Sequence, residues 1–113
     1  MGVFNGMFPI VKGKEGAARA FAAETIGARK ADFEKLQARS NITRETWAMQ
    51  ETPMGSFMLV WFEGDIEKAF ADLASDSSEF AGWFRGQVKD ITGFDLGAPP
   101  EGPLPNVVVD WHS

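Results

Sequence analysis

The spacing of apolar residues predicts the first two elements of the chain. Residues 2–11 are apolar apart from Asn5 and the glycines, which is typical of a buried strand. Residues 15–39 are rich in alanine and charged residues, and their apolar positions recur at intervals of three, four or seven: Ala18, Ala22, Ile26, Phe33 and Leu36. This spacing predicts one long amphipathic helix over residues 15–39, which tolerates Gly27 near its middle.

The middle of the chain predicts a β-hairpin. Its strands are residues 44–51 and 56–63, and the four residues between them read Thr-Pro-Met-Gly. Proline at the second position and glycine at the fourth favour a type I turn. Pairing outward from this turn predicts three cross-strand neighbours: Met49 with Met58, Trp47 with Val60, and Arg44 with Glu63.

Two shorter helices are predicted after the hairpin. Asp65 is a suitable N-cap for the first, whose apolar positions are Ile66, Ala69, Phe70 and Leu73. Asp76 and Glu79 have the spacing of a capping box at the start of the second, residues 78–92. Gly93 is in the right place for its C-terminal cap. The apolar stripe of this second helix is Phe80, Phe84, Val88 and Ile91.

The last part of the chain predicts an extended segment followed by a strand. Residues 94–105 contain four prolines, which exclude a regular element and favour an extended path along the surface. Residues 106–111 include three consecutive valines and predict a buried strand. The element order predicts a single α+β domain over residues 1–113, a ferredoxin-like βαββαβ fold with a four-stranded antiparallel sheet and a second helix split in two.

The second strand of the hairpin is apolar on both of its faces. A sheet with helices on one side usually alternates apolar and polar residues, so the second face needs a cover. We expect a second copy of the chain, packed sheet against sheet, as the partner in a homodimer; the alternative is that residues 94–105 fold over this face. The two apolar sets are Phe57, Leu59 and Trp61 on one side, and Met58, Val60 and Phe62 on the other.

Composition excludes several kinds of chemistry. The 113 residues include no cysteine and one histidine, so a disulfide, a thiolate nucleophile, a cysteine-ligated metal and a multi-histidine metal site are not expected. We expect no metal and no cofactor. The formal net charge of −5, with scattered basic residues, would repel nucleic acid. No apolar run reaches the roughly 20 residues of a membrane span, and a cytoplasmic location is expected.

Several short phrases carry a resemblance to known proteins. ITRETW (42–47), TPMG (52–55), FEGD (62–65) and GPLP (102–105), with Asp110-Trp111 after them, resemble a family of small bacterial proteins without an assigned function. The element order resembles the dimeric α+β barrel superfamily, which includes antibiotic-biosynthesis monooxygenases and heme-degrading monooxygenases. This resemblance implies a dimeric α+β barrel with a pocket between the sheet and the helices of each subunit.

The resemblance to heme-degrading members extends to only some of their residues. Those enzymes use an asparagine on the first strand, a tryptophan on a central strand and a histidine on the helix after the hairpin. Asn5 and Trp61 are similar to the first two, although a shift of one residue would turn Asn5 to the opposite face. Residues 78–92 contain no histidine, so axial heme ligation is not expected, and His112 is expected to be exposed.

Four further residues are candidates for a site. Arg29 interrupts the apolar stripe of the long helix; it either anchors a ligand carboxylate or carbonyl, or pairs at the stripe's edge with an acid such as Asp32. The same two alternatives apply to Arg85, in the helix predicted over residues 78–92. Trp47, like Trp61, either lines a cavity for a flat apolar ligand or packs in the core or dimer interface. Asp110 is either a buried general base or the partner of an arginine.

Two functions follow from these candidates. The first is a non-catalytic or accessory dimeric domain with a pocket for a small, partly apolar ligand. The second is a cofactor-independent, monooxygenase-like enzyme that acts on a flat aromatic or polyketide-like substrate, which Arg29, Trp47, Trp61 and Asn5 would position. Because tyrosine, cysteine and internal histidine are missing, composition favours the first. Whether the protein is an enzyme stays open at this point.

Overall fold

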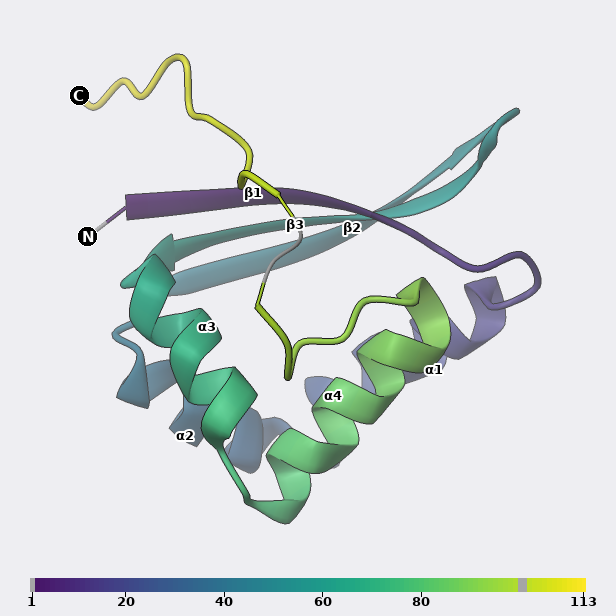
Figure 1. Ribbon diagram of the computed structural model, residues 1–113, viewed down its shortest axis with the longest axis horizontal. Helices are drawn as coiled ribbons and strands as arrows, with labels where there is room; N and C mark the ends of the chain where they lie inside the picture. Colours follow the sequence, from purple (N-terminus) through teal and green to yellow (C-terminus); the bar gives the residue numbers. More distant parts are fainter. Residues whose placement is uncertain (1, 100–101) are drawn as a thin grey trace.

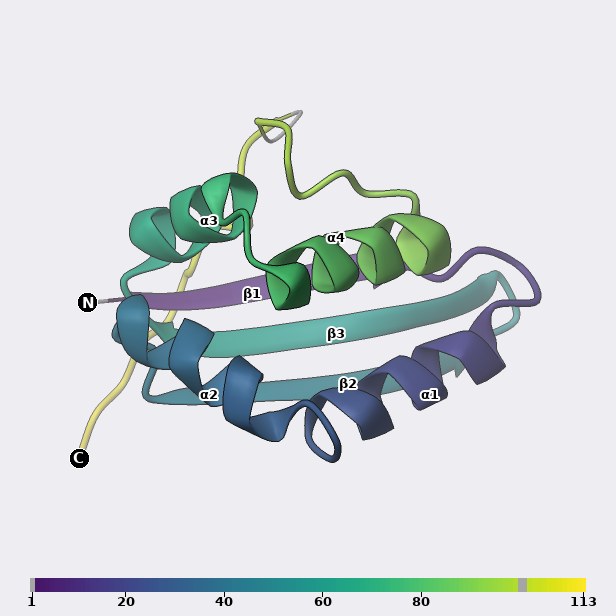
Figure 2. The same cartoon turned by 90° about the horizontal axis from the view of Figure 1, so that it is seen from below.

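The part of the chain that the structure describes forms three strands and four helices, in the order β1-α1-α2-β2-β3-α3-α4. The computed structural model describes residues 2–99 and 102–113. All four helices lie on one face of the sheet (Figures 1 and 2). The strands are β1 (Gly2–Pro9), β2 (Arg44–Thr52) and β3 (Gly55–Gly64). The helices are α1 (Glu15–Thr25), α2 (Lys30–Arg39), α3 (Ile66–Ser75) and α4 (Glu79–Thr92).

The predicted hairpin register is confirmed. The sheet is antiparallel in the order β1-β3-β2, and β2 pairs with β3 as Met49–Met58, Trp47–Val60 and Arg44–Glu63. At the turn, the Thr52 hydroxyl donates to the Gly55 carbonyl at 2.7 Å and accepts from the Met54 N–H at 3.1 Å. Gly55 has φ +125°, a conformation that side-chain-bearing residues rarely adopt. The local turn chemistry therefore fixes the register.

Side chains alternate between the helix side and a second, open face of the sheet. The open face carries odd-numbered residues of β1 and β3 and even-numbered residues of β2, whose exposed fractions exceed those of their neighbours along much of each strand. Its central row is Met7–Leu59–Ala48, in which Met7 is 64% and Leu59 is 36% exposed. Residues 94–99 do not cover this row, because Phe94 packs edge-on against Phe8 on the helix side, at 5.1 Å between ring centroids.

The predicted fourth strand is absent from the described residues. Residues 106–113 are extended but pair with no strand, and Val108, Val109 and Trp111 are 86%, 81% and 79% exposed. The sheet has three strands, so the predicted fold class, a ferredoxin-like βαββαβ fold forming a dimeric α+β barrel, is wrong. A run of valines favours extended backbone, but it forms a strand only where a neighbouring edge accepts its hydrogen bonds.

The helix predicted over residues 15–39 is interrupted. α1 ends at Thr25 and α2 begins at Lys30, with a turn between them in which the Glu24 carbonyl accepts from the Arg29 N–H at 2.9 Å. A Cβ at Gly27 would lie 2.7 Å from the Ala23 carbonyl oxygen, so glycine permits this close turn. As a consequence Ile26, predicted for the core, is 68% exposed.

Helix caps follow the sequence signals with one correction. The Asp65 carboxylate accepts from the Lys68 N–H at 3.2 Å, which confirms it as an N-cap. Ser78, not the predicted capping box, caps α4 by accepting from the Ala81 N–H at 3.2 Å. Gly93 ends α4 in the left-handed conformation, as predicted. None of the helices described is long and apolar enough to cross a membrane.

Ser78→Ala is expected to lower the free energy of unfolding by about 1 kcal/mol, because it removes the side-chain acceptor at the start of α4. Urea unfolding of the two proteins measures the difference. Ser77→Ala is the matched control, since Ser77 is exposed and one residue outside the cap. Equal losses in both variants would show that the Ser78 hydroxyl does not stabilise α4.

Candidate ligand cavity

A cavity of about 110 Å³ lies between the sheet and the helices. Its walls are mostly aromatic and aliphatic, and every layer of the fold contributes to them. This position agrees with the pocket that the sequence resemblance implied. Phenyl rings around it come from β1, β3 and each of the four helices: Phe4, Phe8, Phe62, Phe21, Phe33, Phe70 and Phe84.

Glu45 is a largely buried carboxylate in this apolar wall. It lies on the helix side of β2, where Gln37 Nε2 donates to one of its oxygens at 2.8 Å and Trp47 Nε1 donates to the other at 2.5 Å. Burial raises the pKa of Glu45, and the two hydrogen bonds only partly oppose this effect. No ion pair to Glu45 occurs in the part of the chain that the structure describes.

The polar atoms of the cavity gather at the end where α2 meets β2. Gln37 and Ser40 line the cavity beside Glu45. The Ser40 hydroxyl, which is almost fully buried, donates to Asp72 at 3.0 Å, and Lys68 donates to the same carboxylate oxygen at 2.7 Å. The Lys68 hydrogen bond holds the pKa of Asp72 below its usual range. The cavity therefore has one polar end and a long apolar remainder.

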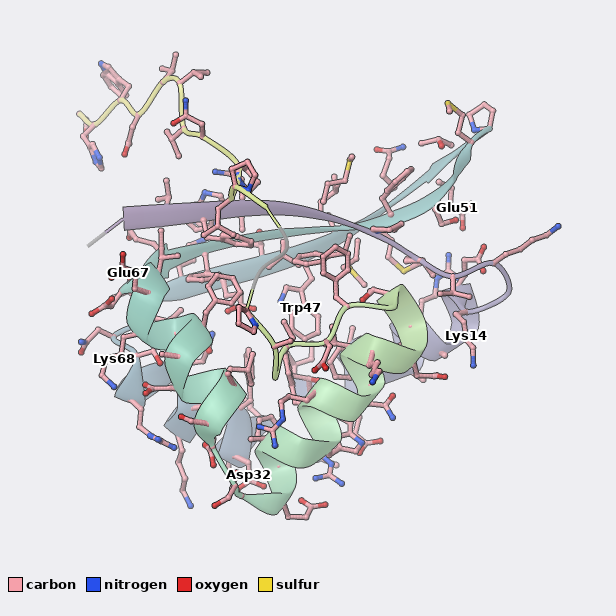
Figure 3. All side chains as sticks on the ribbon, viewed as in Figure 1. Lys14, Asp32, Trp47, Glu51, Glu67 and Lys68 are labelled. Carbon is pink, nitrogen blue, oxygen red and sulfur yellow. The ribbon has the colours of Figure 1, made fainter. Side chains whose placement is uncertain are left out.

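Trp47 is the one predicted site residue that reaches the cavity. It lies between the sheet and the helices (Figure 3) and stacks on Phe21 with 5.3 Å between ring centroids. Asn5 and Trp61 pair with each other across β1 and β3 on the open face, away from the cavity. The sequence left open which way Asn5 turns, and it turns to the side away from the helices.

Arg29 lies in the turn between α1 and α2 and does not line the cavity. Its guanidinium pairs with Glu24 and with Glu79, each at 2.8 Å, and lies 4.2 Å from the centre of the Trp83 ring. The hydrogen bonds that Arg29 donates to Glu79 and Glu24 raise the pKa of Arg29, and the bond that Glu79 accepts from Arg29 lowers the pKa of Glu79. Arg29 thus joins the α1–α2 turn to the start of α4, with partners other than the expected Asp32.

The remaining candidates also lie outside the cavity. Asp110 is half-exposed and pairs with His112, whose Nε2 is 3.0 Å from the carboxylate, so Asp110 is not a buried base. Arg85 donates to the carbonyls of Leu73 and Asp76, each at 2.7 Å. Within residues 2–99 and 102–113, no group of three or more His, Asp or Glu side chains is placed to hold a metal ion.

The sequence contained one signal for Glu45 that the prediction did not use. Glu45, Trp47 and Met49 alternate along β2, so the side of the strand that points Trp47 toward the helices also points Glu45 there. Phe62, a core residue, is the cross-strand neighbour of Glu45. An acid in the same alternating set as core residues is a candidate for burial.

A larger groove of about 660 Å³ adjoins the cavity along the edge of β1. It lies between β1, α3 and the segments 94–99 and 102–105. Phe4, Phe8, Phe70 and Leu96 border both spaces. These four side chains therefore form the wall between the cavity and the more open groove.

Comparisons of this chain with models of protein families, with curated proteins and with solved structures find no match. Any function proposed for this chain therefore has to be inferred from the geometry of the cavity.

Replacing Glu45 with Gln is expected to change how stability depends on pH. In the unfolded chain the carboxyl ionises near its ordinary pKa of 4.5, whereas in the folded protein the pKa is raised. Stability of the wild type therefore falls as pH rises from about 4.5 through the raised pKa, because the unfolded state ionises more readily. Glu45→Gln lacks this decline, so its stability relative to the wild type increases toward neutral pH.

Urea unfolding at a series of pH values from acidic to neutral measures this difference. Glu34→Gln, on the exposed side of α2, removes one carboxylate without removing a buried one and serves as the control. Stability curves for the wild type and Glu45→Gln that stay parallel over the whole range would show that Glu45 is not buried in an ionisable, desolvated form.

Proposed function

We propose that this protein is a non-catalytic binding domain for a small aromatic or partly apolar molecule that carries one hydrogen-bond donor. The observation that carries the proposal is the apolar cavity with a single carboxylate, the largely buried Glu45, at its polar end. A buried charge in an apolar wall is costly for folding, and a ligand donor would offset part of that cost. Ligand binding would therefore compensate part of the desolvation cost of Glu45, which the packing of the domain alone leaves uncompensated.

The size of the cavity limits the ligand. An apolar cavity of about 150 Å³ is known to hold a benzene molecule, and this one measures about 110 Å³. Because the cavity is smaller than one that holds benzene, a single ring with one small substituent is the upper limit for the ligand, and its binding requires the walls to move outward. The wall shared with the groove, between β1 and α3, is the natural route of entry, because no residue of α3 is fully buried.

Phenol and toluene form a matched pair of probes, since a hydroxyl in one replaces a methyl in the other. Isothermal titration is expected to show that the wild type binds phenol about 10-fold or more tightly than toluene, the difference that one hydrogen bond to a carboxylate provides. Glu45→Leu, which removes the acceptor and keeps an apolar side chain of similar size, should abolish this preference.

Ala69→Leu tests the cavity itself. Ala69 lines the cavity from α3, so the larger side chain fills the space and both probes should lose measurable binding. Ala38→Leu, the same change on the exposed side of α2, should leave binding unchanged. Binding of neither probe to the wild type, or equal binding to the wild type and Ala69→Leu, would overturn the proposal.

A monooxygenase-like enzyme is the second candidate. The raised pKa of Glu45 suits a proton acceptor that acts on a flat, acidic aromatic substrate without a cofactor. The small volume weighs against a polyketide-sized substrate. Oxygen uptake by the wild type with a polyhydroxylated aromatic substrate, lost in Glu45→Gln, would favour the enzyme over the binding domain.

We also propose a homodimer formed through the open face. The apolar row of Met7, Leu59 and Ala48 lies at the middle of this face and no helix covers it. Exposed apolar surface of this kind is typical of interfaces. Sedimentation velocity at micromolar concentration is expected to give a dimer, and a monomer at all concentrations would contradict the proposal.

A further inference from the structure

Residues 106–113, which we name the arm, present apolar side chains that the described residues of the same subunit leave largely exposed. Val108, Val109 and Trp111 are each about four-fifths exposed or more. The arm passes the edge of β1 and continues on the side of the sheet opposite the helices (Figures 1 and 2). In the part of the chain that the structure describes, no strand pairing joins the arm to the sheet.

The open face offers a limited footprint for a dimer. Three strands about 4.8 Å apart and about eight residues long give an outline of roughly 14 Å by 26 Å in projection. A stable interface buries about 800 Å² of accessible surface on each partner. The arm is an exposed apolar segment on the same side of the sheet, so its burial would add to the area of such a dimer.

Charge is complementary between the arm and one end of the open face. Arg44 lies in the row Val3–Glu63–Arg44, at the end of the sheet where β1 begins, and its guanidinium lies 5.8 Å from the centre of the Trp61 ring. The arm carries Asp110, and it runs past this same end of the sheet (Figure 1). Within its own subunit Asp110 pairs with His112 at 3.0 Å, so contact with Arg44 of a second copy would share or replace that pair. An acid within an apolar arm and a cation beside an apolar face favour a defined docking position.

We propose that the arm of each copy packs across the open face of a second copy, with Trp111 as its apolar anchor and Asp110 toward the partner's Arg44. The inference rests on the proposed homodimer. A large aromatic residue at four-fifths exposure is the kind of side chain that contributes most to binding once it is buried in an interface. Exchange of arms would add the apolar surface of the arm to the contact area of the dimer.

Removal of residues 106–113 tests the arm. The truncated chain keeps all strands and helices, so it is expected to fold, and its dimer dissociation constant should rise at least 100-fold. Trp111→Ala should raise the constant about 10-fold, and Ser113→Ala should not change it. A wild-type monomer would overturn the homodimer and the arm together, whereas a truncated dimer as tight as the wild type would overturn the arm alone.

Cysteine cross-linking distinguishes exchange from packing within one subunit. The chain has no cysteine, so introduced thiols are the only reactive ones. Val108→Cys and Thr46→Cys chains are mixed and oxidised, and mass spectrometry identifies the linked peptides. A disulfide between position 108 of one chain and position 46 of the other supports exchange; with Glu34→Cys in place of Thr46→Cys none should form. A double variant that links these positions only within single chains would overturn the proposal.

Discussion

Replacing Phe84 with Ala is expected to lower the free energy of unfolding by about 3–5 kcal/mol, the usual cost of removing a buried phenyl ring. Phe84 is 7% exposed and lies at the centre of the aromatic core. Its ring centroid is 5.1 Å from that of Phe21, 5.9 Å from those of Trp47 and Phe80, and 6.3 Å from that of Phe33. Removal of the ring would leave a void between α1, α2, α4 and β2, the elements that carry the neighbouring rings.

The size of the loss matters because a domain of this length has a stability of about 5–15 kcal/mol. Chemical denaturation followed by tryptophan fluorescence reports the change directly, since Trp47 is next to the missing ring. Phe94→Ala is the control: Phe94 is 46% exposed and packs against Phe8, and its loss should cost about 1 kcal/mol. A Phe84→Ala protein as stable as Phe94→Ala would show that the helices do not depend on this cluster.

The elements that could be predicted from the sequence are those with local causes. The hairpin register depends on the turn at residues 52–55, and the caps at Asp65 and Gly93 depend on the residues beside them. The last strand depends on a distant partner edge, which no pattern within residues 106–111 contains. The break between α1 and α2 was missed because the apolar spacing continues across it. Gly27 permits a turn as readily as a helix, so the glycine by itself did not indicate which of the two would form.

The candidate site was predicted only in part, because both faces of the sheet are apolar. Alternation assigns Trp47 and Trp61 to opposite faces once their registers are known, but it does not say which face the helices cover. Trp47 lies inside, while Trp61 and Asn5 lie outside. Glu45 was missed for a different reason. An acid on a strand usually faces water, and the burial of Glu45 depends on which face of the sheet packs against the helices.

Replacing Leu59 with Lys is expected to convert the proposed dimer to a monomer, with the dissociation constant raised at least about 100-fold. Leu59 occupies the middle of the open face, between Met7 and Ala48, and on dimerisation it would lose its remaining contact with water. Two lysine ammonium groups, one from each copy, would be desolvated near each other without a partner, a penalty of about 3 kcal/mol or more.

The partial exposure of Leu59 separates this effect from folding. Because the side chain is 36% exposed in one subunit, a lysine there keeps its ammonium group in water when the subunit is alone. The Leu59→Lys monomer should therefore retain its circular dichroism spectrum and its preference for phenol over toluene. Ala38→Lys makes the same change in charge on exposed α2 and should remain dimeric. Sedimentation velocity that finds both variants dimeric would place the interface elsewhere and leave the apolar open face without the partner we propose.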